Sequence, residues 1–247
     1  GDATAWLRGE EVSTQPRNHA TTHLWPADIH VVGKDILRFH VAYWLAFLMA
    51  GDLPLPKREL VHGWILFNNQ KMSKSLGNTI SPDDLCARYQ NIDKIRYFFA
   101  RYLPITQDSS FSYEEFDERT NADLADSLGN LLQRVTVLGR KTLGNTIQVP
   151  KEWSNASKQL QHDGVVLYDE IQKDLGQYML HRVSASVWKY IGKINEYFHT
   201  QEPWKQAKNN KEACNEIISA ALHAVRSVAS AIWPFMPESA YKINYAL

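Results

Sequence analysis

Two lysines and two serines within five residues form the most specific chemical pattern in this chain of 247 residues. The string KMSKS at residues 71–75 has no amphipathic period, so we expect it to lie in a loop, here called the lysine loop. Ammonium groups on such a loop can approach a polyphosphate and stabilise the charge that develops on an α-phosphate as it reacts. A solvated basic turn without any chemistry is the alternative interpretation.

A glycine and an aspartate mark a second candidate site. Gly33 ends a short apolar strand expected over residues 28–32, and Asp35 begins a helix expected from residue 35 to about residue 49. Nucleotides bind at the carboxyl ends of parallel strands, where a glycine lets adenine approach the backbone. The Asp35 carboxylate could accept hydrogen bonds from ribose hydroxyls or cap the helix, and the two roles are compatible.

One face of that expected helix could bind an apolar ligand. Ile36, His40 and Trp44 are spaced i, i+4 and i+8, which places them on the same side of an α-helix. This aliphatic and aromatic face could enclose an unbranched thioether, because contacts between sulfur and aromatic rings are favourable. A plain core stripe has the same spacing and is the alternative.

Three residues in the second half of the chain could contact single-stranded RNA. Asn130 and Arg134 lie one helical turn apart, where amide and guanidinium groups can read the edges of unstacked bases. Trp204 follows a helix break at Glu202-Pro203, and an exposed indole there could stack on a base. The alternative is a solvated polar pair and a packed tryptophan.

An α/β region is predicted to position the first two of these sites. A strand at 28–32, a helix closed by Gly51 as its C-terminal glycine, and a second strand at 60–67 form the unit of a parallel sheet. Asn68-Asn69 is predicted to make a tight turn before the lysine loop.

Helical patterns dominate the remainder of the chain. Ser81 is expected to cap a helix at 82–90, a second helix follows at 93–103, and Ser112 opens a longer one through a capping box with Glu115. That longer helix carries a core-facing stripe of Leu124, Leu128, Leu131, Val135 and Leu138. Further helical periodicity covers about 165–199 and 211–232. We therefore predict two domains, an α/β domain at 1–110 and an all-α helix bundle at 111–247.

Composition excludes several other classes of protein. Equal numbers of basic and acidic residues, 27 of each, argue against nucleic-acid binding by bulk charge alone. The longest apolar run, residues 41–50, is too short to span a membrane. With only Cys86 and Cys214, a disulfide scaffold and a cysteine zinc knuckle are excluded from this segment. Residues 1–18 do not resemble a signal peptide.

These motifs together resemble a known family. The KMSKS string is similar to the signature loop of class I aminoacyl-tRNA synthetases. The string WPADIHVVGKDILRFH at residues 25–40, Trp44, and VHGW at residues 61–64 resemble the methionyl-tRNA synthetases of that class. The resemblance implies the C-terminal half of a Rossmann-type catalytic domain followed by an α-helical anticodon-binding domain.

The resemblance also implies roles for individual residues. The implied catalytic residues are Lys71, Ser73, Lys74 and Ser75. The implied ATP-binding residues are Gly33, Asp35, Ile65, Lys71 and Lys74, and Ile65 corresponds to a strand position that touches adenine. The implied methionine-binding residues are Ile36, His40 and Trp44. Asn130, Arg134 and Trp204 correspond to residues that read the CAU anticodon.

The expected reaction is activation of methionine by ATP with Mg²⁺ to methionyl-adenylate, followed by transfer to tRNA(Met). No metal ligands, and in particular no zinc, are expected in this segment, and no membrane partner is expected. The expected compartment is the cytoplasm, or the mitochondrial matrix if the enzyme is organellar.

One departure from the family pattern is large. The chain contains no His-x-Gly-His string, which in the family binds the ATP phosphates and helps to form the adenylate. We therefore interpret the chain as the C-terminal portion of such an enzyme and expect it to be inactive alone. Another class I synthetase for an apolar amino acid, a non-catalytic tRNA-binding fragment and a helical interaction domain remain as alternatives.

Overall fold

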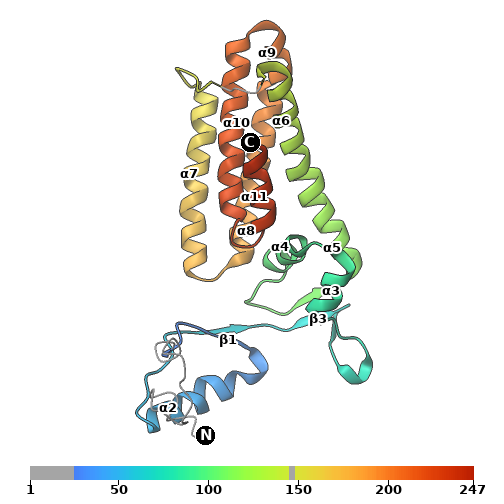
Figure 1. Ribbon diagram of the computed structural model, residues 1–247. Helices are drawn as coiled ribbons and strands as arrows, with labels where there is room; N and C mark the ends of the chain where they lie inside the picture. Colours follow the sequence, from blue (N-terminus) through green and yellow to red (C-terminus); the bar gives the residue numbers. More distant parts are fainter. Residues whose placement is uncertain (1–24, 145–147) are drawn as a thin grey trace, which may run out of the picture. The chain divides into compact units, whose positions relative to one another are not determined.

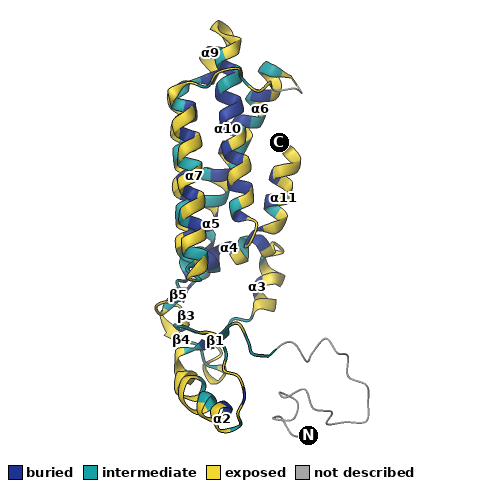
Figure 2. Cartoon of the chain, turned by 90° about the vertical axis from the view of Figure 1, so that its left-hand side faces the viewer, coloured by how far each residue is buried: buried dark blue, intermediate teal, exposed yellow. Residues whose placement is uncertain are grey.

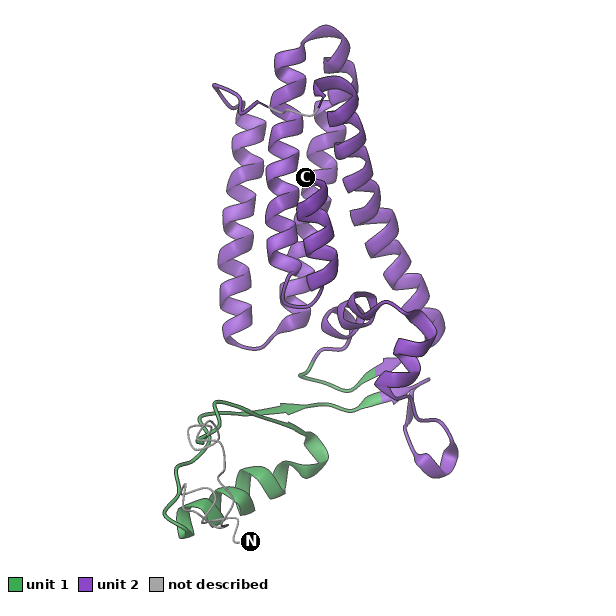
Figure 3. Ribbon diagram, viewed as in Figure 1, with its two compact units in different colours: residues 1–65, 105–109 green, residues 66–104, 110–247 purple. Residues whose placement is uncertain are grey.

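The computed structural model describes residues 25–144 and 148–247 (Figure 1). The chain forms two compact units, coloured separately in Figure 3. Unit 1 comprises residues 1–65 and 105–109, and unit 2 comprises residues 66–104 and 110–247. The residues around the lysine loop therefore pack with the helix bundle, while the predicted division of domains at residue 110 stays a prediction.

Unit 1 contains the predicted parallel strand pair. Strands β1 (His30–Gly33) and β2 (Glu59–His62) run parallel, with His30 opposite Glu59 and Gly33 opposite His62. The helical segment between them begins with a 3₁₀ turn at Lys34–Ile36 and ends with α2 (Leu45–Ala50). Its middle, Phe39–Trp44, is π-helical. The predicted helix is confirmed in extent, although the π-helical turns contain more residues than α-helical turns.

The prediction of one strand over residues 60–67 is wrong. The backbone leaves the β1 ladder at Gly63, whose N–H donates to the carbonyl of Ile105 at 3.1 Å. The next N–H, that of Trp64, donates to the Asp108 carboxylate at 2.9 Å. These distant partners compete for the backbone donors, so a second strand, β3 (Ile65–Phe67), starts in another sheet.

Close backbone contact at Gly63 gives a testable consequence. A Cβ atom built on Gly63 would lie 2.2 Å from the Gln107 carbonyl oxygen and 2.7 Å from the Asp108 nitrogen. We expect Gly63→Ala to lower the free energy of unfolding by about 1–3 kcal/mol, the usual cost of overpacking. Urea unfolding followed by tryptophan fluorescence measures this change.

Gly192→Ala is the matched control for that substitution. A Cβ atom on Gly192 meets nothing within 4 Å, in the middle of an exposed helix face. It should therefore stabilise the chain by about 0.5–1 kcal/mol. Equal unfolding curves for the two variants would contradict the packing argument at Gly63.

The end of α2 differs from the prediction by one residue. The Gly51 N–H still donates to the Phe47 carbonyl at 3.0 Å, so the helical bonding continues through Gly51. The left-handed residue is Asp52, with φ of 53°. Asp tolerates this conformation because its short polar side chain can bond locally. Gly51 thus ends the helix as predicted, but at the C-cap, and Asp52 occupies the C′ position predicted for the glycine.

A small sheet carries the lysine loop. Strands β3 and β4 (Gln70–Lys71) form an antiparallel hairpin, and β5 (Ser109–Phe111) pairs with β3 on its other side. Asn68 and Asn69, with φ of 49° and 62°, make the two-residue turn. Both residues lie in the left-handed region that such hairpin turns require, which confirms the predicted turn.

Helices form the rest of unit 2. Their bounds are α3 (Pro82–Tyr89), α4 (Ile92–Tyr102), α5 (Tyr113–Thr120), a π-helical segment at Asn121–Gly129, α6 (Asn130–Leu143), α7 (Asn155–Gly176), α8 (Leu180–Gln201), α9 (Pro203–Asn209), α10 (Lys211–Ile232) and α11 (Pro237–Ala246). The predicted helical periodicity over about 165–199 is divided between two helices, because the chain turns at Tyr178, with φ of 60°, between α7 and α8. Apolar periodicity continues on both sides of this turn because the two helices pack against each other.

The predicted helix starts are confirmed, with one difference in detail. Ser81 and Asp84 form a reciprocal capping box at α3. Ser112 accepts a hydrogen bond from the Glu115 N–H at 3.1 Å, which caps α5. The Glu115 carboxylate pairs with Arg119 one turn later instead of bonding back to the Ser112 N–H, so the predicted capping box at α5 is wrong.

The main core lies among α8, α10 and their neighbours (Figure 2). Ile191 and Ile194 of α8 pack there with Val225 and Val228 of α10, all fully buried. The predicted stripe is confirmed: Leu128, Leu131 and Val135 are buried, and Leu124 and Leu138 pack against them. Within the described ranges, no helix is long and apolar enough to cross a membrane.

Helix α4 is hydrogen-bonded to α11 and to the residues between α10 and α11. The Arg96 guanidinium donates to the carbonyls of Pro234 and Phe235 at 2.8 and 3.1 Å. The buried Asp93 carboxylate accepts from the Ser239 N–H at 2.6 Å, at the start of α11. These contacts hold α4, which follows the lysine loop in the chain, against the predicted anticodon-binding bundle.

Candidate functional site

The predicted nucleotide site begins at the carboxyl end of β1. A Cβ atom on Gly33 would lie 2.7 Å from Asp35 Oδ1, so the Asp35 carboxylate occupies the space beside the glycine backbone. The helical turn begins after Gly33, and no side chain caps it. The predicted capping role of Asp35 is therefore wrong, and its carboxylate lies beside the Gly33 backbone, where the sequence predicts the adenosine site.

Lys34 is held beside this edge by contacts that the sequence did not predict. Its ammonium lies 2.7 Å from Asp108 Oδ2 and 4.2 Å from the centre of the Trp64 ring. The hydrogen bond from Lys34, and next that from the Trp64 N–H, hold the pKa of Asp108 below its usual range. Lys34 is 74 residues from Asp108 in the chain, so no local pattern could reveal this pair.

Two of the three predicted methionine-binding residues line a common depression in unit 1. This open hollow has a volume of about 800 Å³, and its aromatic members are His30, Phe39, His40, Tyr43, Trp44 and Phe47. Phe39, Tyr43 and Phe47 are exposed despite being large and apolar. These three residues were not among the predicted site residues, and the density of aromatic residues over 39–47 is the signal that could have found them.

Ile36 contacts the predicted methionine-binding residue His40 through its backbone carbonyl. The Ile36 carbonyl oxygen lies 3.0 Å from His40 Nδ1, while the Ile36 side chain does not line the hollow. The π-helical turns after Arg38 change the residue spacing, so i and i+8 no longer share one line on the helix. With Nδ1 bonded to this carbonyl, Nε2 is the ring nitrogen of His40 that this contact leaves unused.

The lysine loop contains short regular elements at both ends. Strand β4 extends to Lys71, and a 3₁₀ turn spans Lys74–Leu76. Asn78 closes the loop, because its Oδ1 accepts from the Ser73 N–H at 2.8 Å and its Nδ2 donates to the Lys71 carbonyl at 3.2 Å. Asn78 was not among the predicted site residues.

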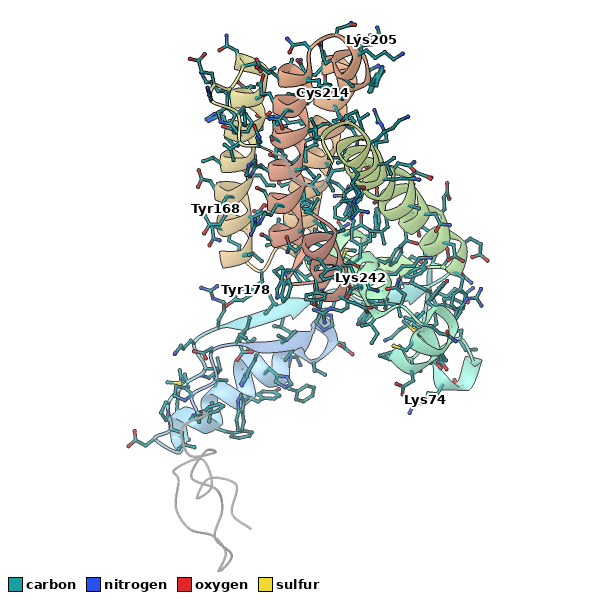
Figure 4. All side chains as sticks on the ribbon, turned by 45° about the horizontal axis from the view of Figure 1, so that its top comes forward. Lys74, Tyr168, Tyr178, Lys205, Cys214 and Lys242 are labelled. Carbon is teal, nitrogen blue, oxygen red and sulfur yellow. The ribbon has the colours of Figure 1, made fainter. Side chains whose placement is uncertain are left out.

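In the lysine loop, the serine hydroxyls contact each other, and the Lys74 ammonium takes no part in that contact. Ser73 and Ser75 share a hydrogen bond between their Oγ atoms at 2.8 Å. Lys74 is exposed, and Figure 4 shows its side chain directed away from the ribbon. No acidic group of the described ranges forms an ion pair with Lys74, so its charge is available to an incoming anion.

Two further predicted site residues, Ile65 and Lys71, lie at the surface. Ile65 is 37% exposed at the start of β3, as a residue that touches a ligand would be. Lys71 is also exposed.

The structure brings two of the predicted RNA-binding residues together. The Arg134 guanidinium of α6 lies 6.0 Å from the centre of the Trp204 ring and 5.3 Å from that of Phe198. Trp204 is 37% exposed, and Asn130 lies exposed one turn before Arg134 on the same helix. We call Asn130, Arg134 and Trp204 the α6–α9 face. It offers a stacking plane and hydrogen-bond donors side by side.

A local turn sets the position of Trp204. Glu202 adopts a left-handed conformation, with φ of 44°, which ends α8 and allows Pro203 to start α9. The indole then packs edge-on against Phe198 with ring centres 6.4 Å apart. The predicted helix break before Trp204 is confirmed.

Models of known protein families match both the α/β region and the helix bundle of this chain. The family described as tRNA synthetases class I (M) matches residues 10–136, and the anticodon binding domain of methionyl tRNA ligase matches residues 149–247. The chain belongs to the class I (M) tRNA synthetases. Membership accounts for an α/β region followed by a helix bundle.

Curated relatives of this synthetase chain are methionine–tRNA ligases. The Brucella suis protein is 39% identical over 219 residues, covering 89% of this chain and 42% of that protein. The Mycobacterium tuberculosis protein is 39% identical over 223 residues, covering 89% of this chain and 43% of that protein. The synthetase chain thus spans less than half the length of these relatives.

Solved synthetase structures are also similar. Mycobacterium tuberculosis methionyl-tRNA synthetase in complex with methionyl-adenylate has a TM-score of 0.85 and 36% identity, covering 92% of this chain and 45% of that chain. Its apo form has a TM-score of 0.82 and 33% identity.

Proposed function

We propose that the complete protein carrying this chain is a methionine–tRNA ligase. It condenses methionine with ATP to methionyl-adenylate and pyrophosphate, and then esterifies the terminal adenosine of tRNA(Met). The observation that carries this proposal is the likeness, at 36% identity, to a synthetase whose structure holds methionyl-adenylate. The hollow lined by His40 and Trp44 supports it, because that hollow is aromatic and lies on the helical segment that follows Gly33.

Each part of the chain has a distinct proposed task. His40 and Trp44 contact the methionine side chain, and Ile36 orients His40 through its carbonyl. Gly33 and Asp35 bind the adenosine, since a bare backbone edge and a carboxylate suit an adenine and a ribose.

The lysine loop acts on the phosphates. Lys71 and Lys74 supply positive charge, while the Ser73–Ser75 hydrogen bond shapes the loop. Such charge lowers the barrier most when it meets charge that develops only in the transition state.

We propose that Mg²⁺ accompanies ATP. The described ranges contain no group of three or more His, Cys, Asp or Glu side chains that could hold a metal ion. Magnesium bound to a nucleotide substrate is usually held by phosphate oxygens together with one or two carboxylates. Aminoacylation would take place in the cytoplasm, or in the mitochondrial matrix for an organellar enzyme.

Methionine-dependent ATP–pyrophosphate exchange by the complete protein tests the reaction. We expect exchange with methionine and far slower exchange with leucine, isoleucine or valine. Fast exchange with one of those three would overturn the assignment to methionine in favour of another class I synthetase. The chain of 247 residues alone should show no exchange, since it lacks a His-x-Gly-His string.

Removing the Trp44 ring should weaken methionine binding by about 10- to 100-fold, because an apolar wall of the pocket is lost. ATP binding should change much less in Trp44→Ala. Equilibrium dialysis with labelled methionine and labelled ATP on the complete protein measures both affinities. Trp233→Ala, which removes an exposed ring of the bundle, is the control. Equal losses for the two ligands would mean that Trp44 only supports the fold.

The α6–α9 face should discriminate between anticodons. We expect Arg134→Ala and Trp204→Ala to reduce the preference for a CAU hairpin over one with a changed first base. Each base contact or stacked base is worth about 1–3 kcal/mol. Fluorescence titration of the chain with the two hairpins gives the ratio of affinities.

Lys205→Ala is the control for this preference. Lys205 lies next to Trp204 on α9 and pairs with Glu202 at 2.7 Å (Figure 4). A lysine that meets only phosphate weakens binding to both hairpins alike. Unchanged discrimination in both Arg134→Ala and Trp204→Ala would place anticodon reading elsewhere.

A further inference from the structure

The Trp44 ring rests on a second tryptophan that no site assignment includes. Trp25 packs edge-on against Trp44, with ring centres 6.2 Å apart and an interplanar angle of 78°. The Trp25 indole is itself fixed, because its Nε1 donates to the Pro54 carbonyl at 2.9 Å. An edge-on pair has a preferred geometry, so the position of Trp25 constrains the angle of Trp44.

A histidine of β1 also contacts the Trp25 ring. The His30 ring centre lies 5.8 Å from that of Trp25, and His30 also lines the hollow that contains Trp44. His30 is therefore in contact both with the hollow and with the residue that backs its wall. An unconstrained imidazole could turn about its side-chain bonds and release Trp25.

A carboxylate on the neighbouring strand holds that imidazole. Glu59 Oε1 lies 2.9 Å from His30 Nδ1, and the two residues are direct partners in the β1–β2 register. Their side chains are only 15% and 20% exposed. With Nδ1–H donating to Glu59, the ring plane of His30 is set by the sheet.

The second carboxylate oxygen of Glu59 is buried at a cost. Glu59 Oε2 has no hydrogen-bond partner among the described residues. Burying an unpaired polar atom is unfavourable, so an apolar residue would serve better if this position only filled space. The carboxylate is therefore best explained by what its other oxygen does for His30.

We propose that Glu59, His30 and Trp25 are positioning residues for the amino-acid side-chain pocket. Glu59 orients His30, His30 and Pro54 fix Trp25, and Trp25 sets the angle of Trp44. The width of the hollow, and hence its selectivity for an unbranched side chain, then depends on Glu59. This inference rests on the proposed function, in which Trp44 walls the methionine site.

Paired variants of the complete protein test the inference. Glu59→Leu should raise the KM for methionine about tenfold, within the usual range for a changed pocket contact, with little change in the KM for ATP. It should also reduce the preference for methionine over leucine. Glu59→Gln should behave nearly as wild type, because its amide oxygen still accepts from His30. Trp25→Ala should resemble Glu59→Leu, and Trp25→Phe should be milder.

Asp28→Leu is the control, since it removes an exposed ion pair with Lys57 in the same unit. Urea unfolding of every variant separates loss of folding from loss of binding. If folded Glu59→Leu and Trp25→Ala keep the methionine KM and selectivity of wild type, the inference is overturned while the proposed function stands. If wild-type protein neither binds methionine nor catalyses exchange, both are overturned.

Discussion

Lys74→Ala, made in the complete protein, is expected to lower the rate of methionine-dependent ATP–pyrophosphate exchange by about 10²- to 10³-fold. The exposed ammonium of Lys74 is available to an anion, and the lysine loop belongs to a class I synthetase chain. Its charge should meet phosphate charge mainly in the transition state, so the loss falls on the rate constant. Methionine affinity, measured by equilibrium dialysis, should stay within about twofold of wild type.

Lys242→Ala is the control for this variant. Lys242 is an exposed lysine that pairs with Glu238 on α11 at 2.6 Å, so its removal deletes a charge without touching the lysine loop. We expect its exchange rate to match wild type. An unchanged exchange rate in Lys74→Ala would contradict the proposed role of the lysine loop.

Asp123→Ala is expected to lower the free energy of unfolding by about 2–4 kcal/mol, because each buried polar group left without a partner costs about 1–3 kcal/mol. The Asp123 carboxylate accepts hydrogen bonds from Tyr97 at 2.5 Å and from Tyr102. Its backbone carbonyl accepts from Trp188 Nε1 at 3.4 Å, which ties α8 to the same point. Tyr97 is fully buried, so its hydroxyl could not find water after the substitution.

Asp126→Ala separates this effect from general changes in the π-helical segment. Asp126 is exposed and lies three residues from Asp123. Urea unfolding followed by far-UV circular dichroism should give a lower midpoint for Asp123→Ala and a nearly unchanged one for Asp126→Ala. Equal midpoints would show that the Asp123 network adds no stability.

Buried tyrosines should also limit stability at high pH. Burial, and next the hydrogen bond to Asp123, raise the pKa of Tyr97 far above its usual range, and burial raises the pKa of Tyr190 to about 12. A group whose pKa is raised in the folded state adds stability below its unfolded pKa of about 10, and this stability is lost as pH rises further. The unfolding midpoint should therefore fall above about pH 10, and Tyr190→Phe should reduce that fall.

Local patterns predicted those features whose causes lie within a few residues. Ser81 caps α3 through Asp84, three residues away, and Asn68-Asn69 forms a hairpin turn from its own conformational preference. The lysine loop and the helix break before Trp204 were also readable, since short strings of residue types define them. In each case the interaction partner is a near neighbour in the chain, so residue type and spacing suffice.

Tertiary structure alone decided the features whose partners are distant. The strand break at Gly63 depends on the backbone at 105–108, and the orientation of Arg134 depends on Trp204, 70 residues later. Apolar periodicity could not reveal the chain reversal at Tyr178 or the π-helical turns that remove Ile36 from the hollow. Apolar periodicity indicates which face of a helix is buried. Long-range hydrogen bonds and ring contacts determine which residues that face contacts.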